Sequence, residues 1–95
     1  MLQVTEKSLE ANLCKSVKRW GGFAVKFWPI SFTGLPDRLV LMPGGRAYFA
    51  EIKAPGKKPK PHQETAHKLL RNLGFTVAVI DDHETLKTFL EEITC

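Results

Sequence analysis

The spacing of apolar residues near the start of the chain predicts a helix. From Thr5 to Trp20 they return every three or four positions, as in a helix with one buried face. These positions are Leu9, Leu13, Val17 and Trp20. Thr5 is a suitable N-cap, and the pair Gly21-Gly22 is a suitable stop. We therefore expect the first helix between these two signals.

Extended segments follow this helix. Residues 23–28, Arg38–Met42 and Arg46–Lys53 have the composition and alternation of strands. The stretch Pro29–Pro36 contains a glycine and two prolines and is expected to be an irregular loop. Between the second and third strands lies Pro43-Gly44-Gly45, which permits the positive φ that a tight turn needs. We therefore expect these two strands to form an antiparallel hairpin.

The second half of the chain predicts a helix, a strand and a last helix. The lysine- and proline-rich segment 54–61 reads as a solvated loop that leads into a helix beginning near Pro61. Gly74 would end that helix, Phe75–Ile80 would be a buried strand, and Asp81-Asp82 would cap the last helix. The expected buried faces are Ala66, Leu69, Leu70 and Leu73 in the second helix, and Leu86, Phe89, Leu90 and Ile93 in the last.

The order of these elements, αβββαβα, predicts an α/β fold. A strand, a helix and a buried strand in succession imply that the third and fourth strands are parallel, while the hairpin is antiparallel. We therefore expect a mixed central sheet flanked by helices. The chain has no internal repeat, and the loop after the hairpin is too short to be an interdomain linker. Residues 1–95 are thus expected to form a single domain.

Length and charge narrow the class of protein. A chain of 95 residues with 43% hydrophobic content can build one modest core, and so small a core favours oligomerisation. The formal charge is +4 and the pI is about 9.3. A basic balance favours polyanionic partners, although many ordinary domains share it. Lys57, Lys58 and Lys60 gather in one segment, which indicates a basic face.

Cysteine usage and the lack of a recognisable signal peptide predict an intracellular, soluble protein. Cys14 and Cys95 lack the spacing of a disulfide framework or a zinc site, so a reducing compartment is expected. No signal peptide and no apolar run long enough to span a bilayer is present in the sequence. A membrane partner is therefore not expected.

Residues of opposite charge fall at chemically informative positions in the hairpin. Glu51 and Lys53 are two residues apart in an extended segment, so their side chains point to the same side. If the turn has three residues, Met42 faces Arg46, and counting outward places Asp37 opposite Glu51. A two-residue turn would instead put the two carboxylates on opposite faces.

Two adjacent carboxylates repel each other, and a hard divalent cation such as Mg²⁺ relieves that repulsion. A lysine beside such a site can stabilise a negatively charged transition state or help to deprotonate water. This combination is typical of phosphodiester hydrolysis. The alternative is that Asp37 caps a turn and that Glu51 and Lys53 form a weak surface ion pair.

At these residues the sequence resembles the PD-(D/E)xK nuclease superfamily, with Pro36-Asp37 as the first half of the motif and Glu51-Ile52-Lys53 as the second. More narrowly, it is similar to the VRR-NUC family, the virus-type replication and repair nucleases. The further matching segments are Gly34-Leu35-Pro36-Asp37-Arg38, Pro43-Gly44-Gly45-Arg46, Phe49–Gly56 and Gln63. The bare motif halves are weak, but their combination with the turn, the glutamine and the order of elements is specific.

The resemblance implies a restriction-endonuclease-like fold and a set of site residues. Asp37, Glu51 and the Ile52 carbonyl would bind Mg²⁺ or Mn²⁺, Lys53 would position or activate water, and Gln63 would support the site. These nucleases also use a glutamate of the first helix. Glu6 and Glu10 lie one turn apart, and we expect Glu10 to be this ligand. Glu6 can equally stabilise the helix N-terminus, and Gln63 can be an exposed first-turn residue.

The implied activity is metal-dependent endonucleolytic hydrolysis of branched DNA that leaves a 5′-phosphate. Standalone members resemble Holliday-junction resolvases and act as homodimers. The expected setting is the cytoplasm of a bacterial host or of a phage-infected cell. Arg38, Lys57, Lys58 and Lys60 are expected to contact DNA. The alternatives are a flap or nicking endonuclease within a larger repair machine and a non-catalytic DNA-binding module.

Other motifs are weaker. His62, His67 and His83 lack the spacing of a helical zinc pair and are expected to be surface or partly buried residues. Pro55-Gly56-Lys57 lacks the upstream glycine of a phosphate-binding loop, which excludes that NTPase motif. Trp20, Phe27 and Trp28 are expected to pack rather than to stack on bases, and Trp28, which borders the irregular loop, is the one alternative candidate for stacking.

Overall fold

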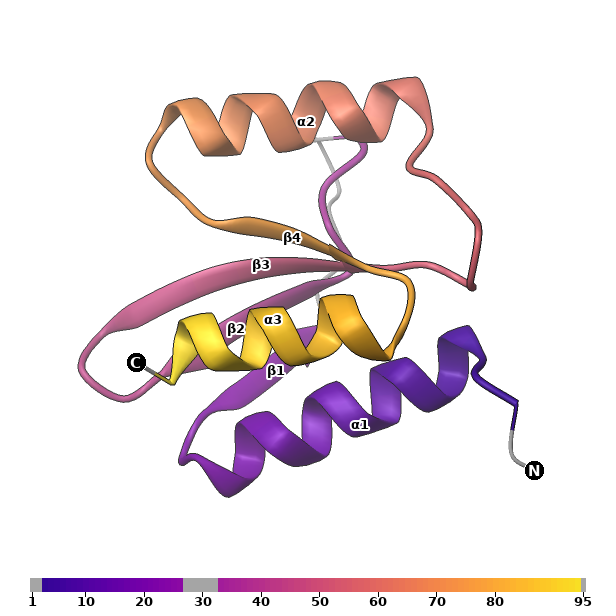
Figure 1. The fold of residues 1–95 in the computed structure, drawn as a ribbon. Helices are drawn as coiled ribbons and strands as arrows, with labels where there is room; N and C mark the ends of the chain where they lie inside the picture. Colours follow the sequence, from indigo (N-terminus) through magenta and orange to yellow (C-terminus); the bar gives the residue numbers. More distant parts are fainter. Residues whose placement is uncertain (1–2, 27–32, 95) are drawn as a thin grey trace.

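The computed structural model describes residues 3–26 and 33–94. Its elements follow the predicted order αβββαβα (Figure 1). They are α1 (Glu6–Arg19), β1 (Phe23–Lys26), β2 (Arg38–Met42), β3 (Arg46–Ile52), α2 (Pro61–Asn72), β4 (Val77–Ile80) and α3 (His83–Ile93). Phe27, Trp28 and the first half of the expected loop 29–36 lie outside the described residues, so the predictions made for them are not addressed.

The strands form one four-stranded mixed sheet in the order β1-β2-β3-β4. The first three strands are antiparallel, and β3 and β4 are parallel. In the hairpin, Met42 pairs with Arg46. Of the two turn lengths that the sequence left open, the structure therefore has the three-residue one, and Gly44 and Gly45 adopt φ values of +85° and +75°. This register decides which side chains of β2 and β3 share a face.

Helices cover both faces of the sheet (Figure 1). α1 and α3 lie side by side on one face, and α2 lies on the other. The main core fills the space between the sheet and the α1–α3 pair. It contains Leu9, Leu13 and Val17 of α1, Val40, Met42, Ala50, Ile52 and Ile80 of the sheet, and Leu86, Phe89 and Ile93 of α3. Because side chains alternate along a strand, the neighbours of these core residues face α2.

Side chains cap α1 and α3 at the predicted residues. The Thr5 Oγ1 accepts a hydrogen bond from the Ser8 N–H at 3.0 Å, and the Asp82 Oδ1 accepts one from the Thr85 N–H at 2.7 Å. In both cases the third residue of the helix returns a hydrogen bond to the cap. Such reciprocal bonds satisfy backbone donors that a helix start leaves free. The two helix starts are therefore determined locally.

The buried face of α2 differs from the prediction. Ala66 and Leu70 are buried as expected, but Leu69 is 50% exposed and Leu73 is 75% exposed, while His67 is 1% exposed. The helix is rotated so that a polar residue replaces a leucine against the sheet. On this face the sheet end presents Glu51 and Lys53, and the rotation brings Gln63 into hydrogen bonds with both and places His67 beside Glu51.

No helix within residues 3–26 and 33–94 combines the length and apolar character needed to cross a membrane.

Candidate active site

Glu51 is the central residue of the site. It lies near the end of β3 on the sheet face that α2 covers, and it is 1% exposed. The Lys53 Nζ is 3.4 Å from the Glu51 Oε2, because residues two apart in an extended segment point to the same side. The Lys53 side chain is only 16% exposed. The structure thus brings these two residues together in a largely buried setting rather than as a surface pair.

Asp37 reaches the same place from the neighbouring strand. It directly precedes β2, and its Oδ2 accepts a hydrogen bond from the Ile52 N–H at 3.0 Å. The observed register pairs Arg38 with Ala50, so one further step outward sets Asp37 opposite Glu51. The sequence placed Asp37 opposite Glu51 only for a three-residue turn. The structure has that turn, and the two carboxylates lie together.

The loop before Asp37 packs tightly on the start of α2. A Cβ added at Gly34 would lie 2.5 Å from the His62 carbonyl oxygen, and Gly34 has a φ of +87°. Both the close approach and the positive φ require glycine at this position. Gly34 therefore links the segment that carries Asp37 to the helix that carries the next site residue.

Gln63 connects α2 to the carboxylate site. Its Oε1 accepts hydrogen bonds from the Lys60 N–H at 2.8 Å and from the Lys53 Nζ at 2.9 Å. Its Nε2 donates to the Glu51 Oε2 at 3.3 Å. One amide thus caps the helix start and contacts both Glu51 of β3 and Lys53 directly after it. Gln63 is therefore a contact residue of the site and not an exposed first-turn residue.

The surroundings of Glu51 disfavour the ionised form of its carboxyl group. Burial and, after it, the negative charge of Asp37 together raise the pKa of Glu51 from 4.5 to about 7, against the opposing effect of Lys53. Burial raises the pKa of an acid because a charge is poorly solvated away from water. A cation between the two carboxylates would offset both the burial and the repulsion, because its positive charge stabilises the ionised carboxylates.

His67 is a residue of this site that the sequence analysis missed. It was expected at the surface or partly buried, yet it is 1% exposed, and its Nε2 is 3.7 Å from the Glu51 Oε1. Burial and the positive charge of Arg71 lower the pKa of His67, so its ring is neutral at neutral pH. The available signal was the spacing from Gln63, since residues four apart lie on one helix face.

Glu10 and Arg38 form a pair between α1 and β2. The Arg38 Nη2 is 3.1 Å from the Glu10 Oε2, and the Arg38 Nη1 donates to the Ala24 carbonyl at 2.9 Å. The predicted ligand from the first helix and the predicted DNA contact are therefore engaged with each other. Glu6 lies exposed in the first turn of α1.

Comparisons with known proteins decide the family. Over 84 residues the chain is 43% identical to "Putative nuclease p44" of Acyrthosiphon pisum secondary endosymbiont phage 1, which covers 88% of this chain and 90% of that protein. A solved structure described as a VRR_NUC domain matches with a TM-score of 0.84 and 28% identity, covering 93% of this chain and 97% of that one. No family model matches. The chain belongs to the VRR-NUC family.

Membership in the VRR-NUC family confirms the predicted α/β fold of three helices around a four-stranded mixed sheet. The two similar proteins also support the prediction that this protein is a nuclease.

The VRR-NUC site has donors that suit a hard divalent cation. Asp37 and Glu51 supply carboxylate oxygens, and Mg²⁺ and Mn²⁺ prefer oxygen ligands. The Glu51 Oε1 is buried and makes no hydrogen bond, so it has a lone pair to offer. Within residues 3–26 and 33–94 no group of three or more acidic, histidine or cysteine side chains is arranged to hold a metal. A bound cation would thus need backbone carbonyl or water ligands as well.

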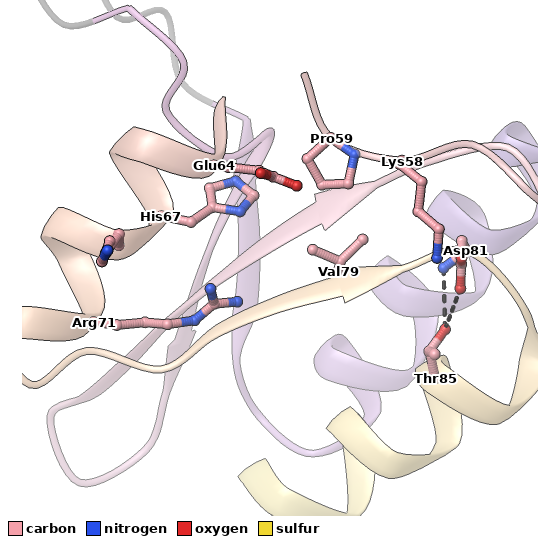
Figure 2. A pocket seen from close by; sticks show the side chains of 9 residues that line it. Lys58, Pro59, Glu64, His67, Arg71, Val79, Asp81 and Thr85 are labelled. Atoms are coloured by element: carbon pink, nitrogen blue, oxygen red, sulfur yellow. Dashed lines mark hydrogen bonds between the residues drawn. The ribbon is translucent and has the colours of Figure 1, made fainter. Parts of the chain in front are cut away.

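A cavity of about 620 Å³ opens on the other side of His67. Figure 2 shows it between α2, the loop that precedes α2, and the segment from β4 into α3. Lys58, Lys68 and Arg71 line it, as do two acidic residues, Glu64 and Asp81. Three cations against two carboxylates give the cavity a small positive excess. The other predicted DNA-contacting lysines, at positions 57 and 60, are exposed in the same loop.

Proposed function

We propose that this VRR-NUC protein is a divalent-metal-dependent endonuclease that hydrolyses phosphodiester bonds in branched DNA, with four-way junctions as the preferred substrate. The observation that carries this proposal is the burial of Glu51 between Asp37 and Lys53. A protein gains nothing in stability from two adjacent carboxylates, one of them buried. Their cost is understandable if the site binds a cation and a phosphate.

The residues divide the chemistry among them. Asp37, Glu51 and the Ile52 carbonyl are the proposed ligands of Mg²⁺ or Mn²⁺, and Glu10 is a further one once it releases Arg38. When bound, the cation supplies Lewis acidity and lowers the pKa of an attacking water. Lys53 places its ammonium beside the scissile phosphate, where negative charge develops.

Gln63 has a supporting role in this proposal. Its hydrogen bonds to Lys53 and Glu51 hold both groups in the orientation that the reaction needs. The attack would break the bond between phosphorus and the 3′ oxygen and leave a 5′-phosphate.

DNA contacts are proposed for Arg38, Lys57, Lys58 and Lys60. The three lysines stand in the loop that follows β3 directly, so a strand bound at the carboxylate site would pass near them. Lysine and arginine bind the DNA backbone by neutralising phosphates. Because the p44 relative comes from a phage, we propose that the protein acts on DNA in a phage-infected cell.

We further propose that the protein is a homodimer, since paired cuts on opposing strands require two linked sites. The exposed apolar face of β1 supports this. Phe23 is 66% exposed and Val25 is 41% exposed, and Leu41, which pairs with Phe23, extends the same face at 39% exposed. Sedimentation equilibrium with and without junction DNA tests the proposal. A monomer under both conditions would contradict it and favour a flap or nicking endonuclease.

A cleavage panel tests the activity. Duplex, flap, splayed and four-way DNA are incubated with Mg²⁺, with Mn²⁺ or with EDTA, using the parental protein, Asp37→Asn and Asp81→Asn. We expect metal-dependent cleavage that Asp37→Asn abolishes, because the asparagine keeps an acceptor for the Ile52 N–H and loses only the charge. Asp81→Asn is the control, since Asp81 lines the cavity and not the carboxylate site. Binding of DNA without cleavage under every condition would favour the non-catalytic module instead.

A further inference from the structure

Two buried atoms on the α2 side of the sheet have no hydrogen bond. Within residues 3–26 and 33–94 they are the Glu51 Oε1 and the His67 Nε2, and they lie 3.7 Å apart. Each belongs to a side chain that is 2% exposed. Native proteins rarely leave buried polar atoms without partners, so such a pair calls for an explanation.

The two oxygens of the Glu51 carboxylate have different surroundings. Oε2 accepts a hydrogen bond from Gln63 at 3.3 Å and lies 3.4 Å from the Lys53 Nζ. Oε1 makes no hydrogen bond and lies 3.7 Å from the His67 Nε2, slightly too far for one. A movement of about half an ångström would close this gap to ordinary hydrogen-bond length. The carboxylate is thus held firmly on one side and only loosely on the other.

Simple packing does not account for a histidine at this position. The apolar Leu69 and Leu73 of the same helix are turned outward, while His67 is turned toward the sheet. Burying the ring costs its hydration, and the present arrangement returns no hydrogen bond at Nε2. This cost is expected if the Glu51 Oε1 accepts a hydrogen bond from His67 when the site holds a ligand.

We propose that His67 is a positioning residue, whose Nε2–H donates a hydrogen bond to the Glu51 Oε1 when Glu51 binds a divalent cation. The inference rests on the proposed function, because it takes Glu51 to be a metal ligand. Residues that hydrogen-bond to a metal ligand fix its orientation and increase metal affinity. His67 would therefore complete, from α2, the set of contacts that Gln63 begins.

Binding of Mn²⁺ alone, without DNA, tests this role. The proteins are the parental chain, His67→Leu, His67→Gln and the control His62→Leu, which removes an exposed histidine from the same helix. We expect His67→Leu to weaken Mn²⁺ binding by about tenfold to a hundredfold. His67→Gln keeps a donor and should recover much of the loss, and His62→Leu should bind as the parental protein does. A folded His67→Leu variant with parental Mn²⁺ affinity would overturn the inference.

A second measurement covers the case in which His67→Leu does not fold. Nitrogen-15 NMR of the parental protein, titrated with Mg²⁺, reports the protonation and hydrogen bonding of each ring nitrogen. We expect the Nε2 of His67 to carry a proton in the Mg²⁺-bound state and its resonance to move on binding. An unprotonated Nε2 in that state would refute the role. If the parental protein binds neither ion, the proposed function fails too, whereas normal parental binding with an indifferent His67 defeats this inference alone.

Discussion

The burial of Glu51 makes a quantitative prediction about stability. The change is Glu51→Gln, which keeps the size of the side chain and removes its charge. The pKa of Glu51 is about 7 in the folded protein against 4.5 as the ordinary value. Since each pKa unit corresponds to about 1.4 kcal/mol, keeping the ionised carboxylate in the fold costs up to about 3 kcal/mol above pH 7.

The sign of this effect is fixed by the direction of the pKa shift. Because the folded pKa is raised, the contribution of the protonated carboxyl is fully present below pH 4.5 and is lost as the pH rises through about 7. In EDTA the parental protein should therefore lose stability between these two pH values. Glu51→Gln should lack that loss and be the more stable protein at pH 8, by as much as about 3 kcal/mol.

Urea unfolding followed by circular dichroism at pH 4.5, 6, 7 and 8 is a suitable assay. Glu84→Gln is the matched control, because Glu84 is an exposed carboxylate in the first turn of α3. Its difference from the parental protein should change little with pH. The reasoning is refuted if Glu51→Gln follows the parental pH dependence, or if it is the less stable protein at pH 8. Adding Mg²⁺ at pH 8 should narrow the gap, since a cation stabilises the parental carboxylates and not the amide.

Three further predictions concern other parts of the molecule. Lys53→Ala should slow single-turnover cleavage by about a hundredfold and weaken DNA binding far less, and an equal loss in both would place Lys53 in the binding surface. Replacing Lys57, Lys58 and Lys60 together by alanine should lower the slope of log affinity against log salt by about two to three units, whereas an unchanged slope would mean that this loop is merely solvated. Leu13→Ala, at a fully buried position of α1, should cost about 2–5 kcal/mol of unfolding free energy. Leu73→Ala, at a 75% exposed position, should cost less than about 0.5 kcal/mol in the same urea titration, and equal losses would contradict the packing described for α1.

Local signals in the sequence were sufficient to predict the helices and strands and to identify the family. Thr5 and Asp82 cap the two helices at which they were expected, because a cap depends on residues three positions away. Pro43-Gly44-Gly45 predicted a tight turn for the same reason, although the sequence left the register of the hairpin open. Glu51 and Lys53 share a face through strand alternation alone. These features depend on neighbours along the chain, so the chain order was enough to predict them.

Contacts between distant segments were decided only by the tertiary structure. The apolar pattern of α2 predicted that Leu69 and Leu73 face the sheet, but the helix turned His67 inward. Its rotation depends on the groups of β3 that meet it, which lie more than ten positions away in sequence. The engagement of Glu10 with Arg38 and the joining of Lys53 and Glu51 by Gln63 have the same origin. Helical periodicity identifies which residues share a face, but the polar groups across the interface determine which face is buried.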